Sequence, residues 1–135
     1  MDNKELIIKH ATVLFTELED KGYGRNIVID VTDDKIRSQI EAWAKENGIK
    51  PKIKEYTNKE GKTTQQYQLK LSKFIKIAGK EQSFTESSLG YGALINFSAV
   101  VYEYDNKFGK GKSASITNIF IIEPMKNTKM AELSE

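Results

Sequence analysis

Residues 93–123 read "ALINFSAVVYEYDNKFGKGKSASITNIFIIE", and this stretch decides the fold. It holds two long runs in which β-branched and aromatic residues alternate with others, a pattern typical of strands. Between the runs, "DNKFGKGK" supplies the Asn, Lys and Gly residues that suit an extended hairpin loop. The stretch therefore predicts a long β-hairpin.

Alternation in the first run divides its side chains between two faces. One face is expected to join the core: Ile95, Phe97, Ala99 and Val101. The other is expected to point outwards: Leu94, Asn96, Ser98, Val100, Tyr102 and Tyr104. Tyrosines beside a lysine-bearing loop can stack unpaired nucleic-acid bases, although cross-strand packing would also account for each of them.

The loop ends in Gly111-Lys112-Ser113, as the phosphate-binding loop of nucleotide hydrolases does. That loop needs the spacing G-x-x-x-x-G-K-[ST] between a strand and a helix. The position of its first glycine is occupied by Asn106, and the residues after Ser113 alternate like a strand. The sequence therefore argues against a nucleotide-hydrolase loop.

The remainder of the chain predicts three further strands. Residues 6–18 could form a strand or a short helix. As a strand they would share one face among Ile7, Ala11, Val13 and Phe15. Residues 26–31 and 66–77 alternate more clearly, with Phe74 on the wet face of the second strand.

One helix is expected after Asp33, whose side-chain oxygen suits an N-cap, and Gly48 follows the segment as a stop signal. Its apolar face would hold Ile36, Ile40, Trp43 and Ala44. At this spacing we interpret Trp43 as a core residue rather than a stacking surface for a ligand. Residues 49–65 lack a sustained apolar period and predict a mobile loop or a hairpin extension.

These elements favour a small β-barrel with one inserted helix, and a curled antiparallel sheet is the alternative. A chain of 135 residues with 39% hydrophobic content suits one core. We expect residues 1–124 to form this single domain. Residues 125–135 should form a flexible C-terminal tail, because the periodicity is lost after Pro124.

The net charge of +2 hides an uneven distribution. Residues 45–80 hold ten lysines and three glutamates, a sum of +7, whereas residues 1–44 sum to −3 and residues 81–135 to −2. Such a basic strip is expected where a polyanion binds, although a solvated lysine-rich loop has the same composition. Lysine contacts phosphate without reading bases, so the strip predicts sequence-tolerant binding.

We therefore predict a nucleic-acid-binding surface built from aromatic and lysine side chains. Its candidate residues come from the hairpin and the basic strip: Tyr102, Tyr104, Lys107, Phe108, Lys110, Lys112, Lys70, Lys73 and Lys76. This combination suits a single-stranded nucleic acid, whose unpaired bases offer faces for stacking.

Other classes of function have little support in the sequence. The chain has no Cys, and His10 is its only histidine, so a metal site or a nucleophile–base pair lacks the necessary residues. Asp30, Asp33 and Asp34 could gather near a strand end, but the last two read more simply as first-turn residues of the helix. We expect no catalysis, no metal and no cofactor. No membrane span or signal peptide is expected, which favours the cytoplasm.

The chain resembles the single-stranded DNA-binding proteins of tailed bacteriophages, in particular those of short-tailed coliphages and their relatives in other phages and prophages. The resemblance follows the order of three segments, "YGRNIVIDVTDDKIRSQIEAW", "YQLKLSKFI" and "LGYGALINFSAVVYEYDNKFGKGKSASITNIFIIEP", and covers roughly residues 5–124. The closing pattern of the family is matched by Gly90, Gly92, Tyr102, Tyr104, Asn106, Gly109, Gly111 and the run Ile119–Glu123.

This resemblance implies an OB-fold, here a five-stranded barrel that is mainly β with one inserted helix. It implies binding of single-stranded DNA in phage replication or recombination, in the host bacterial cytoplasm. Replication or recombination proteins would be its partners, and a homodimer would be one assembly. Better-known members end in a strongly acidic tail, whereas this chain ends in "KNTKMAELSE", which argues against recruitment or dimerisation through the tail. A structural or protein-interaction barrel that binds no nucleic acid is the alternative function.

Overall fold

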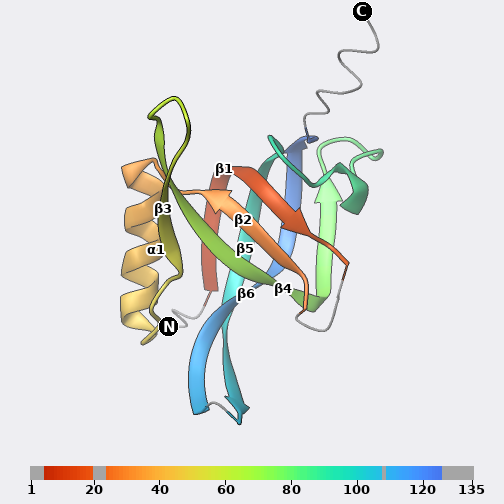
Figure 1. The fold of residues 1–135 in the computed structure, drawn as a ribbon. Helices are drawn as coiled ribbons and strands as arrows, with labels where there is room; N and C mark the ends of the chain where they lie inside the picture. Colours follow the sequence, from red (N-terminus) through yellow and green to blue (C-terminus); the bar gives the residue numbers. More distant parts are fainter. Residues whose placement is uncertain (1–4, 20–23, 108, 126–135) are drawn as a thin grey trace, which may run out of the picture.

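The computed structural model describes residues 5–19, 24–107 and 109–125 and consists of strands around one core with a helix at the side (Figure 1). The elements in chain order are β1 (Glu5–Glu17), β2 (Asn26–Asp30), α1 (Asp34–Glu46), β3 (Ile53–Thr57), β4 (Thr63–Gly79), the short 3₁₀-helix η1 (Glu86–Ser88), β5 (Leu94–Asn106) and β6 (Gly109–Glu123). Within the described ranges, no helix has the length and apolar character needed to cross a lipid bilayer.

Five of the strands close into a ring. The sheet order is β2-β1-β5-β6-β4, and β2 also pairs with β4, which completes the barrel. The β4–β6 pairing is parallel and the other pairings are antiparallel. β3 lies outside the ring and pairs with the start of β4. The predicted OB-fold-like barrel, mainly β with one inserted helix, is confirmed, and the curled open sheet is wrong.

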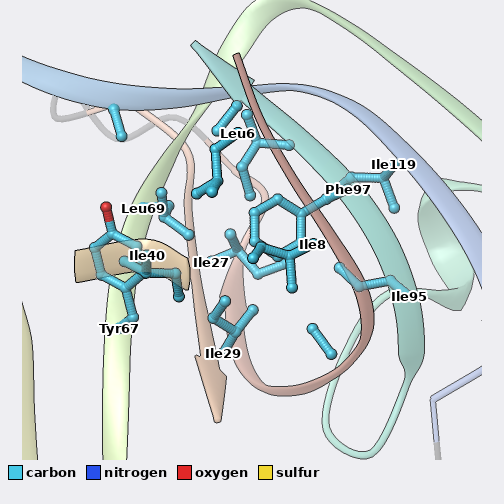
Figure 2. Close-up of a cluster of buried hydrophobic side chains, with 14 of the residues drawn as sticks. Leu6, Ile8, Ile27, Ile29, Ile40, Tyr67, Leu69, Ile95, Phe97 and Ile119 are labelled. Atoms are coloured by element: carbon cyan, nitrogen blue, oxygen red, sulfur yellow. The ribbon is translucent and has the colours of Figure 1, made fainter. Parts of the chain in front are cut away.

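The core fills the inside of this ring with aliphatic and aromatic side chains from every barrel strand, as the labelled cluster in Figure 2 shows. Ile27 and Ile29 come from β2, Tyr67 and Leu69 from β4, and Ile95 from β5, and all five are buried. On β5, Phe97 and Ala99 are also buried and Val101 packs against the core, whereas the alternate residues are not buried. The predicted division of β5 into two faces is therefore confirmed.

β1 is a strand, but its predicted face is wrong at both ends. Ala11 and Val13 are buried as expected, whereas Ile7 and Phe15 are each 57% exposed. The pairing of β1 with β5 shifts between Ile8 and Ala11, where His10 adopts a φ of 60°, and this bulge lies between Ile7 and the buried Ala11. The pairing of β1 with β2 shifts again between Val13 and Phe15, and this second irregularity separates Phe15 from the buried Val13. An extra residue in a strand reverses which side chains face the core, and the sequence pattern alone does not reveal that residue.

The helix and the segment after it follow the sequence pattern. The Asp33 side chain accepts hydrogen bonds from the backbone N–H groups of Lys35 and Ile36, at 2.8 and 3.4 Å, as an N-cap does. Trp43 lies buried against the barrel, which confirms its core role. Residues 49–65 form β3 and the turn that joins it to β4, so the hairpin extension is confirmed.

β5 and β6 form the longest pairing of the barrel, from Leu94 opposite Glu123 to Asn106 opposite Gly109. The end of this hairpin projects beyond the ring, at the bottom of Figure 1. β6 continues through Ser113 to Glu123, so no helix follows the Gly-Lys-Ser sequence and a nucleotide-hydrolase loop is excluded. The projecting hairpin instead provides one wall of a groove on the barrel surface.

Candidate nucleic-acid interface

A groove lies beside the hairpin where the hairpin leaves the barrel. We call it the tyrosine groove, and it is lined by Lys50, Lys52, Lys70, Tyr102, Tyr104, Lys112 and Ser113. These residues come from the segment between α1 and β3 and from β4, β5 and β6. Four separate parts of the chain thus bring two aromatic rings and four lysines together.

The two tyrosines of β5 each pair with a small residue of β6, which leaves room for their rings. Tyr102 pairs with Ser113 and Tyr104 pairs with Gly111. A Cβ atom at Gly111 would collide with the hydroxyl and ring of Tyr104, so this ring lies across the β6 backbone at the glycine. The ring centroids of Tyr102 and Tyr104 are 6.5 Å apart with an interplanar angle of 54°. The hairpin therefore presents two aromatic surfaces side by side.

A second hollow adjoins the tyrosine groove and shares Lys70 and Tyr102 with it. We call it the bulge hollow, and it is lined by Gly24, Arg25, Lys70, Leu71, Ser72, Lys73, Phe74, Val100, Tyr102, Ser115 and Thr117. Because they share two residues, the tyrosine groove and the bulge hollow form one continuous surface, which we call the basic groove.

The bulge hollow takes its shape from an irregularity in β4. Leu71 pairs with Ile116 and Lys76 pairs with Asn118, so residues 72–75 of β4 stand opposite the single residue Thr117 of β6. Bulges re-aim side chains and are common next to functional sites. Phe74 lies within this bulge, and its side chain is 87% exposed, on the face that alternation in the sequence predicts. Phe74 therefore adds a third aromatic surface to the basic groove.

Arg25 braces this bulge. Its Nη2 donates to the carbonyl oxygen of Ser72 at 3.3 Å, and its Nη1 pairs with the carboxylate of Glu86 at 2.6 Å. The Arg25 carbonyl oxygen accepts from the N–H of Leu71 at 3.0 Å, and the N–H of Phe74 donates to the Ser72 hydroxyl at 3.2 Å. Phe74 therefore projects from backbone that is fixed on both sides.

The basic groove is strongly cationic. Its basic side chains are Arg25, Lys50, Lys52, Lys70, Lys73 and Lys112, and the described residues that line it include no carboxylate. Arg25 is paired with Glu86, and Lys112 stands opposite Glu103 in the hairpin. The other four lysines have no ion-pair partner within the described part of the chain. This charge suits a phosphate backbone.

The structure brings five of the nine predicted site residues to the basic groove, namely Tyr102, Tyr104, Lys70, Lys73 and Lys112. Lys110 lies 3.9 Å from Asp105 and lines a hollow at the hairpin end, together with Glu103 and Tyr104. Lys107 is exposed in the turn, and Phe108 lies outside the described residues. Lys76 lines a different hollow, with Ile7 and Phe120.

Sequence reasoning missed Lys50, Lys52, Arg25 and Phe74. Lys50 and Lys52 reach the groove because β3 adds to the edge of β4, where the carbonyl oxygen of Lys52 accepts from the N–H of Gln68 at 3.3 Å. The sequence does contain an indication for Phe74. It is a large apolar residue on the polar face of an alternating strand, where it cannot pack into the core. Among the described residues, no three His, Cys, Asp or Glu side chains are grouped so that they could hold a metal ion.

No protein-family model and no curated protein sequence matches the chain. Solved structures do match its fold. The single-stranded DNA-binding protein from bacteriophage Enc34, in complex with single-stranded DNA, is 14% identical with a TM-score of 0.65, over 93% of this chain and 89% of that one. Another solved structure of the Enc34 single-stranded DNA-binding protein is 14% identical to this chain, with a TM-score of 0.64. That match covers 97% of this chain and 91% of the Enc34 chain.

The gp2.5 single-stranded DNA-binding protein encoded by bacteriophage T7 is 12% identical with a TM-score of 0.53, over 94% of this chain and 96% of that one. The similarity therefore extends over nearly the whole of each chain. At these identities it establishes the architecture, and it agrees with the resemblance found in the sequence. The chain has the OB-like fold of phage single-stranded DNA-binding proteins.

Proposed function

We propose that this protein binds single-stranded DNA in the basic groove, without reading its sequence. The observation that carries the proposal is the arrangement of Tyr102, Tyr104 and Phe74 among four lysines that have no ion-pair partner in the described structure. Aromatic faces stack unpaired bases of any identity, and lysines neutralise the backbone. The fold that this chain shares with phage proteins of that function supports the same assignment.

The chemistry of the groove favours single strands over duplexes. In a duplex the bases are paired and stacked on one another, so their faces are not available to the rings of the tyrosines and Phe74. Stacking on aromatic side chains contributes about 1–3 kcal/mol per base, and a single strand can gain it without first being unpaired. Lysine dominates the charged lining, and lysine–phosphate contacts position a strand without selecting bases.

The direct test is a fluorescence anisotropy titration with a labelled mixed-sequence DNA strand, the matching duplex and the equivalent RNA, each at two salt concentrations. We expect the single strand to bind more tightly than the duplex, with an affinity that falls steeply as salt rises. No binding at low salt would reject the proposal and leave a structural or protein-interaction barrel. Equal binding of duplex and single strand would remove the stacking mechanism.

We further propose that the protein acts in phage or prophage DNA replication or recombination, by coating single strands and without catalysing a reaction. The support is the shared fold with the Enc34 and T7 proteins. In that role it would work in the host bacterial cytoplasm beside replication or recombination proteins, as a monomer or homodimer. Deletion of its gene from the phage or prophage should lower the yield of replicated or recombinant DNA, and an unchanged yield of both would count against this role.

A further inference from the structure

The outer face of the barrel carries another hollow, which the proposed function does not use. We call it the amide patch and define it by Ile7, Lys9, Lys76, Asn96, Asn118 and Phe120. Two large apolar side chains are open there, since Ile7 is 57% exposed and Phe120 is 42% exposed. The patch thus combines an exposed aromatic ring, two lysines and two side-chain amides.

Strand register assembles this patch in two neighbouring rows. In the first row Ile7 pairs with Ser98, Ser98 with Asn118, and Asn118 with Lys76, across four adjacent strands. In the second row Asn96 pairs with Phe120, and Phe120 with Ala78. Side chains that are directly opposite on paired strands project from the same face. The ring of Phe120 therefore stands next to the amides of Asn96 and Asn118.

Hydrogen bonds within the protein orient the side-chain amides of Asn96 and Asn118. One amide is left with a free acceptor and the other with a free donor. Asn118 Nδ2 donates to the hydroxyl of Ser98 at 2.9 Å and to that of Thr117 at 3.2 Å, which leaves Oδ1 to accept from a ligand. Asn96 Oδ1 accepts from the N–H of His10 at 2.8 Å, which leaves Nδ2 to donate. A donor and an acceptor beside an aromatic ring match the edge and face of an unpaired base.

Backbone strain supports the orientation of Asn96. His10 has a φ of 60°, an uncommon conformation for a residue with a side chain, and it lies at the β1 bulge. Its N–H is turned toward the Asn96 side chain in this conformation. Strained residues persist where the surrounding structure holds them, and they are frequent at binding sites.

The amide patch is continuous with the basic groove. Thr117 lines the bulge hollow, and its hydroxyl lies 3.3 Å from that of Ser98, which stands between Ile7 and Asn118 in the first row of the amide patch. The β4 bulge that carries Phe74 ends at Lys76, the lysine of the patch. From Tyr104 to Asn96, the outward face of β5 covers eight residue steps, about 26 Å at the rise of a strand. One surface therefore links the hairpin tyrosines to Phe120.

The charge of the patch also suits a phosphate backbone. Lys9 and Lys76 are exposed and have no ion-pair partner within the described residues. Glu5 is the single carboxylate among the described residues of this hollow, and it pairs in register with Val100, toward the bulge hollow. Two lysines against one glutamate leave the patch cationic.

We propose that single-stranded DNA longer than the basic groove continues onto the amide patch, where Phe120 stacks one further base. Asn96 and Asn118 bond to the edge of that base, and Lys9 and Lys76 contact the adjoining phosphates. This inference rests on the proposed function, because it extends the path of the same strand. It makes the amide patch a second base-binding site on one barrel.

The test compares two oligothymidine probes, one of about 4 and one of about 12 nucleotides, within the range of site sizes of OB folds. Phe120→Ala should weaken binding of the long probe at least about fivefold, the lower limit for a stacked base, and leave the short probe unchanged. Lys9→Ala/Lys76→Ala should reduce the salt slope for the long probe by about 1.4 and leave that of the short probe unchanged. The matched control is Phe15→Ala, which removes an exposed aromatic ring from β1, 57% exposed against 42% for Phe120, outside the basic groove and the amide patch.

Three outcomes would overturn the inference. The long probe could bind no more tightly than the short one, the variants could leave long-probe binding unchanged, or they could weaken both probes equally. In each case the wild-type protein still binds, so the proposed function stands. Failure of the wild-type protein to bind either probe at low salt would instead reject the proposed function, and the inference with it. The side-chain amide NMR signals of Asn96 and Asn118 provide a second readout, and they should shift with the long probe only.

Discussion

Replacing Lys50 and Lys52 by alanine tests whether the basic groove holds a phosphate backbone. Neither residue has an ion-pair partner in the described structure, and both are exposed, so the variant should fold normally. With Lys70 and Lys73 they make four uncompensated lysines on the groove. The logarithm of affinity for a single strand falls with the logarithm of salt by about 0.7 for each neutralised phosphate.

Four contacts give a slope of about −2.8, so the wild-type affinity should fall about 50-fold between 50 and 200 mM salt. Lys50→Ala/Lys52→Ala should lower the slope to about −1.4, which corresponds to about a sevenfold fall over the same range. The assay is an anisotropy titration, at several salt concentrations in that range, of one labelled strand that fills the basic groove and is too short to reach the amide patch.

The control for this experiment is Lys59→Ala/Lys62→Ala, which removes the same charge from the turn between β3 and β4, outside the basic groove. It should keep the wild-type slope. A slope that is unchanged in Lys50→Ala/Lys52→Ala would show that these lysines do not hold the backbone. A slope that falls equally in both double variants would show that only the total charge matters.

Four further predictions follow from the geometry. Tyr104→Ala should weaken single-strand binding by about 1–3 kcal/mol. In the same titration Tyr91→Ala, which removes an exposed ring outside the basic groove and the amide patch, should leave the affinity unchanged. Gly111→Ala should displace the Tyr104 ring and weaken binding several-fold, with a urea midpoint close to that of the wild type, because the clash is with the end of a movable side chain. Burial raises the pKa of Tyr67 from 10.0 to about 12, because the ionised phenol would lose its hydration in the core. The unfolded chain therefore ionises first, and the free energy of unfolding should fall by up to about 3 kcal/mol as the pH rises from 10 to 12. In urea unfolding at these pH values, Tyr67→Phe should lose less stability than the wild type. Asp33→Ala should lower the free energy of unfolding by about 1 kcal/mol through loss of the helix N-cap, and an unchanged urea midpoint would contradict this role.

The sequence predicted most of the fold because the strongest patterns coincide with regular elements. Burial alternates without a break along the first half of β5, and Ile40, Trp43 and Ala44 lie on one face of α1, so in each element the residue period matches the side that faces the core. The prediction that Ile7 and Phe15 face the core was wrong for a physical reason. A bulge depends on the φ of one residue and on the partner strand, and neither is encoded in the period of a single strand.

The candidate site was predicted in part for a related reason. The tyrosines lie on a regular strand, so their direction follows from alternation. Lys50 and Lys52 reach the groove through the pairing of β3 with β4, which is a contact between segments rather than a local pattern. The displacement of Lys76 from the tyrosines has a similar origin, because the four-residue bulge in β4 separates it from Lys70. Long-range pairing therefore sets the outline of the groove.

The closure of the ring through β6 also has a consequence for folding during synthesis. β6 pairs with β5 and, in parallel, with β4, so the barrel cannot close until residues up to Glu123 have left the ribosome. Until then this edge of β4 has no partner strand. Pairings between distant segments form slowly because a long loop must first be ordered. The partly synthesised chain is therefore the form most exposed to aggregation and proteolysis, and this exposure ends when the barrel closes.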